Sequence, residues 1–75
     1  MTSLDVTFGY NAVPSERELR ALDSVREVYG IGRLSFNEEA RTVTVQFDAS
    51  RLKSDGVARL LRQAGLDLKE TLAVV

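Results

Sequence analysis

The stretch Val43-Thr44-Val45-Gln46-Phe47 decides the fold of this 75-residue chain. Its apolar side chains alternate with polar ones, the period-two pattern of a strand with one buried face. Its β-branched and aromatic residues also favour extended backbone. The same alternation occurs earlier in the chain, in Leu4-Asp5-Val6-Thr7-Phe8. We therefore expect two equivalent strands, each of which begins one half of the chain.

A helix signal follows each of these strands. Ser15-Glu16-Arg17-Glu18 has the capping-box pattern, in which the Ser15 hydroxyl and the Glu18 carboxylate each accept from the other residue's backbone N–H. Apolar residues continue at helical spacing to Tyr29, and we expect Gly30 to end the helix. In the second half we expect Ser54 to cap a helix that ends at Gly65. Ser15 and Ser54 follow their strands at the same interval, which supports two βαβ units.

Shorter alternating segments around residues 33–36 and 68–74 complete a βαββαβ order. Two βαβ units side by side predict an α+β, ferredoxin-like sandwich in one domain, residues 1–75. It has a four-stranded antiparallel sheet with two helices on one face. The inward side chains are expected to be Leu4, Val6, Phe8, Leu34, Phe36, Val43, Val45, Phe47, Leu68, Leu72 and Val74. The outward ones are expected to be Asp5, Thr7, Arg33, Ser35, Thr42, Thr44, Gln46, Lys69, Thr71 and Ala73.

The charges and the hydropathy of the chain argue against two classes of partner. Ten basic and eleven acidic residues are interspersed, which leaves a net charge of −1 and no basic excess for nucleic acid. The expected outward face also has no aromatic residue on which RNA bases could stack. No apolar stretch is long enough to span a membrane, and no secretory signal is visible. We therefore expect a small soluble, cytoplasmic domain without a nucleic-acid partner.

The chain contains no cysteine and no histidine. It therefore lacks the commonest general base, the best protein nucleophile and the main ligands for zinc and copper. Ser15 has no histidine to activate it and already has a capping role. Glu38 and Glu39, adjacent in a polar turn, are interpreted as solvated charges. We expect no catalytic residue, no cofactor and no enzymatic activity.

The layout and the segment from Asp48 to Leu68 resemble the heavy-metal-associated (HMA) domains of copper chaperones and metal pumps. The first loop of that family resembles Gly-Met-x-Cys-x-x-Cys, and here it reads Gly9-Tyr10-Asn11-Ala12-Val13-Pro14-Ser15. Tyr10 stands at the Met position, Ala12 at the first Cys and Ser15 at the second. Leu66 stands where the family often has an aromatic residue. The resemblance thus implies an HMA-like fold with a degenerate metal-binding loop, because neutral Ser is a poor ligand for Cu(I) and Ala is none.

These observations favour a non-catalytic HMA-like module that acts by protein interaction or as an accessory domain of a metal-handling system. An apolar loop with a proline is expected to pack on the core, and the functional alternative is a contact surface formed by Tyr10, Asn11, Ala12, Val13 and Pro14, since related domains dock partners through this loop. The edge strands, expected to be the second and the fourth, are another place for a protein partner or a homodimer. Two alternatives stay open. One is heavy-metal binding or transport with ligands completed by a partner, and the other is an ACT-like small-molecule regulatory domain, which shares this topology.

Overall fold

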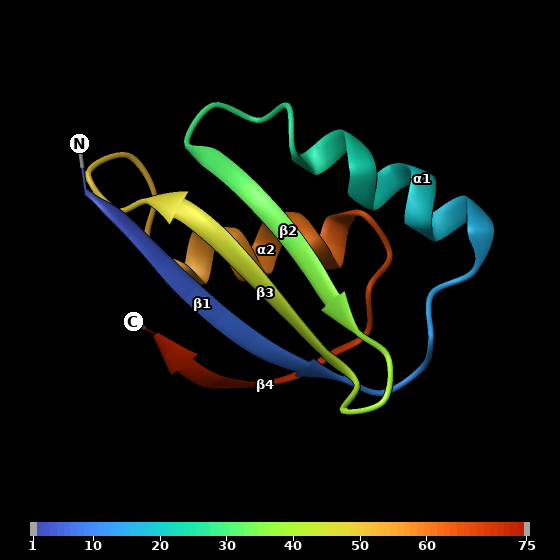
Figure 1. Cartoon of the computed structure of the whole chain (residues 1–75). Coiled ribbons are helices and arrows are strands. Elements are labelled where there is room, and N and C mark those ends of the chain that lie inside the picture. The colour runs from blue at the N-terminus through green and yellow to red at the C-terminus, as the bar shows by residue number, and fades with distance from the viewer. Residues whose placement is uncertain (1, 75) are drawn as a thin grey trace.

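The computed structural model describes residues 2–74, so Met1 and Val75 lie outside the account that follows. The elements are β1 (Ser3–Tyr10), α1 (Glu16–Val25), β2 (Ile31–Asn37), β3 (Thr42–Asp48), α2 (Ser54–Gln63) and β4 (Leu68–Val74). The strands form one antiparallel sheet in the order β2-β3-β1-β4, and the helices cover one face of it (Figure 1). This confirms the predicted βαββαβ architecture. No helix within residues 2–74 is long and apolar enough to cross a membrane.

The core lies between the sheet and the helices, and the two central strands supply its centre. Val6 pairs with Val45 and Phe8 with Val43, as the period-two pattern predicts. Leu22 of α1 and Leu61 of α2, at equivalent positions of the two halves, are both essentially inaccessible. The buried apolar side chains are Val6, Phe8, Tyr10, Leu22, Val25, Ile31, Leu34, Val43, Val45, Phe47, Val57, Ala58, Leu61, Leu66 and Leu68.

The predicted faces of β4 are wrong at Thr71 and Leu72. The register between β1 and β4 shifts twice, so that β4 contains extra residues and its period-two alternation is reset. Thr71 pairs with Phe8 and lies beside α2, whereas Leu72 lies beside Gly9 on the outer face and is 52% exposed. In the sequence, Glu70 breaks the alternation of this strand, but this does not say where the extra residues fall.

Helix α1 ends at Val25 and does not continue to Gly30 as predicted. The following residues form tighter turns, in which Glu27 N–H donates to the Ser24 carbonyl at 3.1 Å and Val28 N–H to the Val25 carbonyl at 3.0 Å. Such i to i−3 bonds change the rotation per residue, so the helical spacing no longer applies. Tyr29 is consequently on the surface, where the Arg51 guanidinium lies 4.2 Å from its ring centroid. Gly30 does have the expected positive φ, +101°.

The two helices begin differently, although the sequence predicts a Ser cap for both. The capping box of Ser15 and Glu18 is present, which confirms that prediction. The N-cap of α2 is Lys53 and not Ser54, and it makes no side-chain cap bond. Instead, Asp48 organises the connection before α2: its Oδ1 accepts from the N–H of Ser50 at 3.0 Å and from the Ser50 hydroxyl at 2.6 Å.

Candidate functional site

The first loop, residues 11–15, is fixed at its β1 end by two other connections of the fold. Tyr10 N–H donates to the Arg41 carbonyl and Asn11 N–H to the Asp67 carbonyl, both at 3.0 Å. The Asn11 side-chain amide also donates to the Asp67 carboxylate at 3.3 Å. The Arg41 guanidinium in turn donates to the Asn11 carbonyl. The β2–β3 turn and the α2–β4 connection therefore hold the start of this loop from two sides.

The α1 end of the loop is fixed by the capping box. Ser15 N–H donates to Glu18 Oε1 at 2.8 Å, and Glu18 N–H donates to Ser15 Oγ at 3.3 Å. The Glu18 side chain also packs against Gly65 at the end of α2, where a Cβ atom would lie only 3.2 Å from it. Gly65 has a φ of +107°, a backbone conformation that favours glycine, and a side chain there would also press on Glu18. The Ser15 hydroxyl thus has a structural role at a contact between the two helices.

Between these anchors, the structure exposes only the middle of the predicted contact surface. Asn11, Ala12 and Val13 are exposed, with 51% of Val13 accessible. Tyr10 and Pro14 are buried, as packing of the loop on the core requires, so their side chains do not contribute to an exposed surface. Tyr10 is the last residue of β1, and period-two alternation carries it to the inner face with Phe8. The sequence contained this signal, but the position of Tyr10 in a predicted loop concealed it.

The buried Tyr10 phenol is an unusual feature of the core. Its ring meets that of Phe36 edge-on, with centroids 6.0 Å apart and an interplanar angle of 73°. Its hydroxyl has no hydrogen-bond partner among the residues described. Burial raises the pKa of Tyr10, and the nearby Glu38 carboxylate adds to this effect while Arg41 opposes it. The phenol is therefore neutral at physiological pH, and an unpaired buried hydroxyl of this kind costs about 1–3 kcal/mol.

The positions at which HMA domains carry metal-binding thiols hold Ala12 and Ser15 in this chain, and neither side chain carries a soft ligand atom. Ala12 offers no ligand atom, and the Ser15 hydroxyl accepts from the Glu18 N–H. Leu66, at the usual aromatic position, is buried in the core. Within residues 2–74 no three side chains of His, Cys, Asp or Glu come together as a metal site would need. A soft cation such as Cu(I) prefers thiolate or thioether ligands, so the donor set does not fit it.

The fold of this chain has a counterpart among solved structures. No family model and no curated protein matches the chain. Among solved structures, the yeast copper transporter domain CCC2A, determined in solution in its apo and Cu(I)-loaded states, superimposes with a TM-score of 0.73. The match covers 93% of this chain and 96% of that one. At 14% sequence identity the match confirms the HMA-like fold and leaves the function open.

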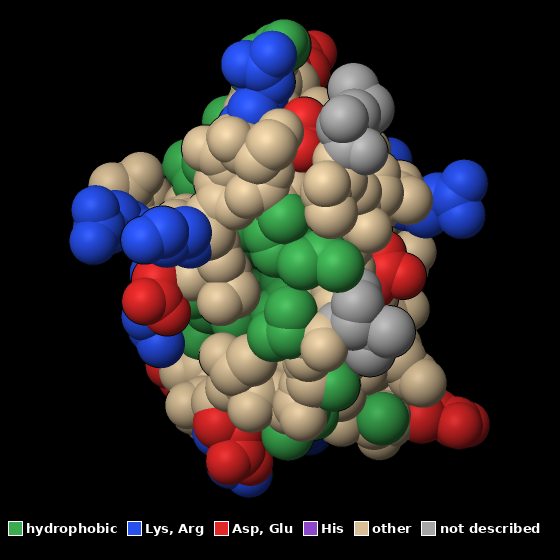
Figure 2. Space-filling view, turned by 90° about the vertical axis from the view of Figure 1, so that its left-hand side faces the viewer, with side chains coloured by type: hydrophobic (Ala, Val, Ile, Leu, Met, Phe, Trp, Pro, Cys, Tyr) green, Lys and Arg blue, Asp and Glu red, His purple; other side chains and the backbone are tan. Residues whose placement is uncertain are grey.

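The structure has a second candidate surface, which we call the edge groove, beside β2, one of the two edge strands predicted as a place for a partner or a homodimer. It lies between α1 and the free edge of β2 and is lined by Glu16, Leu19, Arg20, Leu22, Asp23, Arg26, Leu34 and Phe36. In the sequence, Leu19 shares the helical spacing of Leu22, which predicts an inward side chain, whereas in the structure it is 43% exposed. A different side of the molecule shows a band of hydrophobic side chains flanked by charges of both signs (Figure 2). Exposed apolar surface is thus not confined to the first loop.

Proposed function

We propose that this chain is a non-catalytic, cytoplasmic interaction module that serves a metal-handling system through the tip of its first loop. The observation that carries the proposal is an exposed apolar side chain on a loop with two fixed ends. Val13 is half exposed, while Asn11 is held by Asp67 and Arg41, and Ser15 by Glu18. A loop that is ordered before binding loses little conformational entropy when a partner docks.

The chemistry of the tip indicates the kind of partner. Asn11 supplies polar groups at the rim, while Ala12 and Val13 present a small apolar surface. Such a surface fits a shallow apolar pocket better than a charged patch, because it carries no charge to pair. The fold likeness to a copper transporter domain supports a partner among metal-handling proteins. In this proposal, recognition between proteins remains although the thiols that would carry the metal are absent.

Site-specific photo-crosslinking tests the proposal. A benzophenone amino acid at position 13 should crosslink one metal-handling protein in cells, and the same probe at Arg59, on the exposed side of α2, should not. With the purified partner, Val13→Asp should then weaken binding about tenfold or more, because the charge would have to be desolvated. Leu72→Asp is the matched control, since Leu72 is 52% exposed but lies on β4. Equal loss of binding in both variants would contradict a role for the loop.

The fold likeness favours one second candidate, metal-ion transfer with ligands completed by a partner. An NMR titration of the isolated chain with Cu(I) and with Zn²⁺ under reducing conditions separates the two. The interaction proposal expects no saturable chemical-shift change in residues 10–15 at stoichiometric metal. Saturable shifts there would overturn it and establish the metal-binding alternative.

A further inference from the structure

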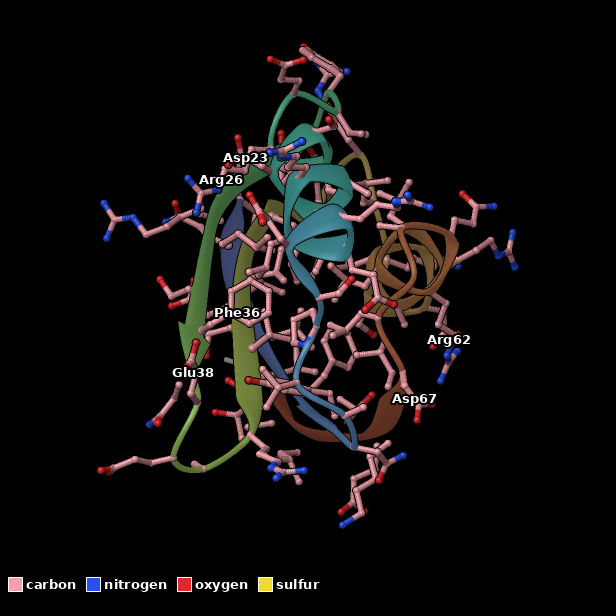
Figure 3. The ribbon with its side chains drawn as sticks, turned by 90° about the vertical axis from the view of Figure 1, so that its right-hand side faces the viewer. Asp23, Arg26, Phe36, Glu38, Arg62 and Asp67 are labelled. Carbon is pink, nitrogen blue, oxygen red and sulfur yellow. The ribbon has the colours of Figure 1, made fainter. Side chains whose placement is uncertain are left out.

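The edge groove combines an apolar floor with a charged rim. Figure 3 shows Asp23 and Arg26 on the side of α1 that faces β2, and Phe36 between the strand and the helix. The floor is formed by Leu19, Leu22, Leu34 and Phe36, and the rim by Glu16, Arg20, Asp23 and Arg26. Of the floor residues, Leu19 is 43% exposed and Phe36 is only partly buried, so the floor is open to solvent.

The strand beside the groove offers backbone groups to a further strand. β2 is an edge strand of the sheet, and its residues 34–37 pair with β3 without a register shift. The Arg26 guanidinium donates to the Leu34 carbonyl at 3.1 Å, so this carbonyl faces the free edge. In an antiparallel strand the N–H and C=O of one residue point the same way, and the direction alternates. Phe36 therefore also presents its backbone groups to the edge. The opposite edge, β4, is interrupted by two register shifts.

The rim charges have an order that is complementary to itself. Along α1 they run acid, base, acid, base: Glu16, Arg20, Asp23, Arg26. In a two-fold symmetric pair the helices run antiparallel, so Glu16 meets the partner's Arg26 and Arg20 meets the partner's Asp23. Each of these contacts joins opposite charges and takes the place of the exposed pairs that one copy makes within α1, Glu16–Arg20 at 3.0 Å and Asp23–Arg26 at 3.5 Å. A two-fold interface requires this property, because one patch must complement its own copy.

We infer that a second copy of this chain docks on the edge groove, with β2 antiparallel to the partner's β2 and the two α1 helices face to face. Leu19 and Phe36 lose their exposure in the dimer. In the dimer the Arg26 guanidinium leaves the Leu34 carbonyl and pairs with the partner's Glu16. The Leu34 carbonyl can then accept a hydrogen bond from an N–H of the added strand. The regular part of the β2 edge is only residues 34–37, and the rim charges are exposed and already paired within α1, so we expect a weak dimer that is populated at high concentration. This surface is separate from the first loop, and the inference goes beyond the proposed function.

Sedimentation velocity from about 10 µM to about 1 mM tests the dimer, since this range brackets weak dissociation constants. The wild-type chain should shift from monomer to dimer, and less so at high salt. Glu16→Arg alone and Arg26→Glu alone should each remain monomeric, because each sets two pairs of like charges against each other. An equimolar mixture of these two variants should form a heterodimer, and the double variant should regain the homodimer.

Arg59→Glu, a charge reversal on the exposed side of α2, is the matched control and should associate as the wild type does. Circular dichroism melts of every variant establish that each one folds. A monomeric wild type at the highest concentration, or a monomeric variant mixture, would overturn the inference. So would a dimer that tolerates Arg26→Glu and is lost in Leu72→Asp, since the interface would then lie on β4. None of these results bears on Val13 and its partner.

Discussion

Each half of the chain contains a strand followed by a helix. The connection from strand to helix is fixed at its helix end in the first half and at its strand end in the second. In the first half, the capping box of Ser15 and Glu18 fixes the connection where the helix begins. In the second half, Asp48 fixes it where the strand ends, and α2 begins without a side-chain cap. The position equivalent to Asp48 in the first half is Gly9, which has no side chain to do the same. Core positions thus repeat because both halves fill one interior, whereas a connection needs only to satisfy its own backbone groups.

The largest effect should come from the repeated core positions, and it should be similar in both halves. Leu22→Ala and Leu61→Ala each empty a fully buried site and should each lower the free energy of unfolding by about 2–5 kcal/mol. Urea denaturation measures both. Leu72→Ala, at a half-exposed leucine, is the control and should change stability far less. A difference of several kcal/mol between the two core variants would show that the halves do not share the interior equally.

Substitutions at the starts of the two helices should affect stability differently in the two halves. Ser15→Ala removes one half of the capping box and should lower the free energy of unfolding by about 0.5–2 kcal/mol. Ser54→Ala changes a residue that caps nothing and should leave stability within about 0.5 kcal/mol of the wild type. Thermal melts followed by circular dichroism compare the two. Equal losses would mean that the two helices begin alike in solution.

Tyr10, whose counterpart in the second half is the small residue Ala49, allows a test of the unpaired phenol. Tyr10→Phe removes a buried hydroxyl without a described partner and keeps the ring against Phe36, so stability should rise by about 1 kcal/mol. Tyr29→Phe, at an exposed tyrosine, is the matched control and should have little effect. Urea denaturation of both variants checks this. A loss of stability in Tyr10→Phe would reveal a hydrogen bond to the hydroxyl, for example through bound water.

The smallest effect should be the pH dependence of the stability that the Asp48 carboxylate gives to the connection between β3 and α2. Hydrogen bonds from the Ser50 hydroxyl and from the Ser50 N–H, with a further one from the Thr2 N–H, hold the pKa of Asp48 below its ordinary value. A lowered folded-state pKa gives stability that is present above the unfolded value, about 3.9, and is lost as pH falls through the folded value.

The unfolding free energies of the wild type and Asp48→Asn should therefore differ more at about pH 7 than at about pH 3. Glu39→Gln, in the exposed β2–β3 turn, is the control for a general loss of negative charge. A constant difference between wild type and Asp48→Asn at both pH values would mean that the carboxylate charge does not matter to this turn.

The parts of the structure that the sequence predicted are those set by periodicity and local capping. The alternation in residues 43–47 and 4–8 predicted the two central strands, and the capping box of Ser15 and Glu18 predicted the start of α1. The wrong predictions concern residues whose position is decided by strand register and turn geometry and not by the spacing of apolar residues. The register shifts against β1 turned Leu72 outward, and tight turns after Val25 placed Tyr29 on the surface. Of the contact surface considered from the sequence, residues 10–14, only Asn11, Ala12 and Val13 are exposed. The edge groove depends on where α1 lies against β2, which no local pattern encodes.

The central place of β1 also governs how the chain can be built during synthesis. Val6 pairs with Val45 on one side and with Val74 on the other, so both neighbours of the first strand are made long after it. Among the strand pairs within residues 3–74, the β2–β3 hairpin alone joins strands that are close together along the chain. Non-local strand pairing must close large loops before any contact forms, which slows folding. On the ribosome, the apolar β1 therefore waits unpaired until β3 and then β4 emerge, and the sheet is completed only when the last strand has left the exit tunnel.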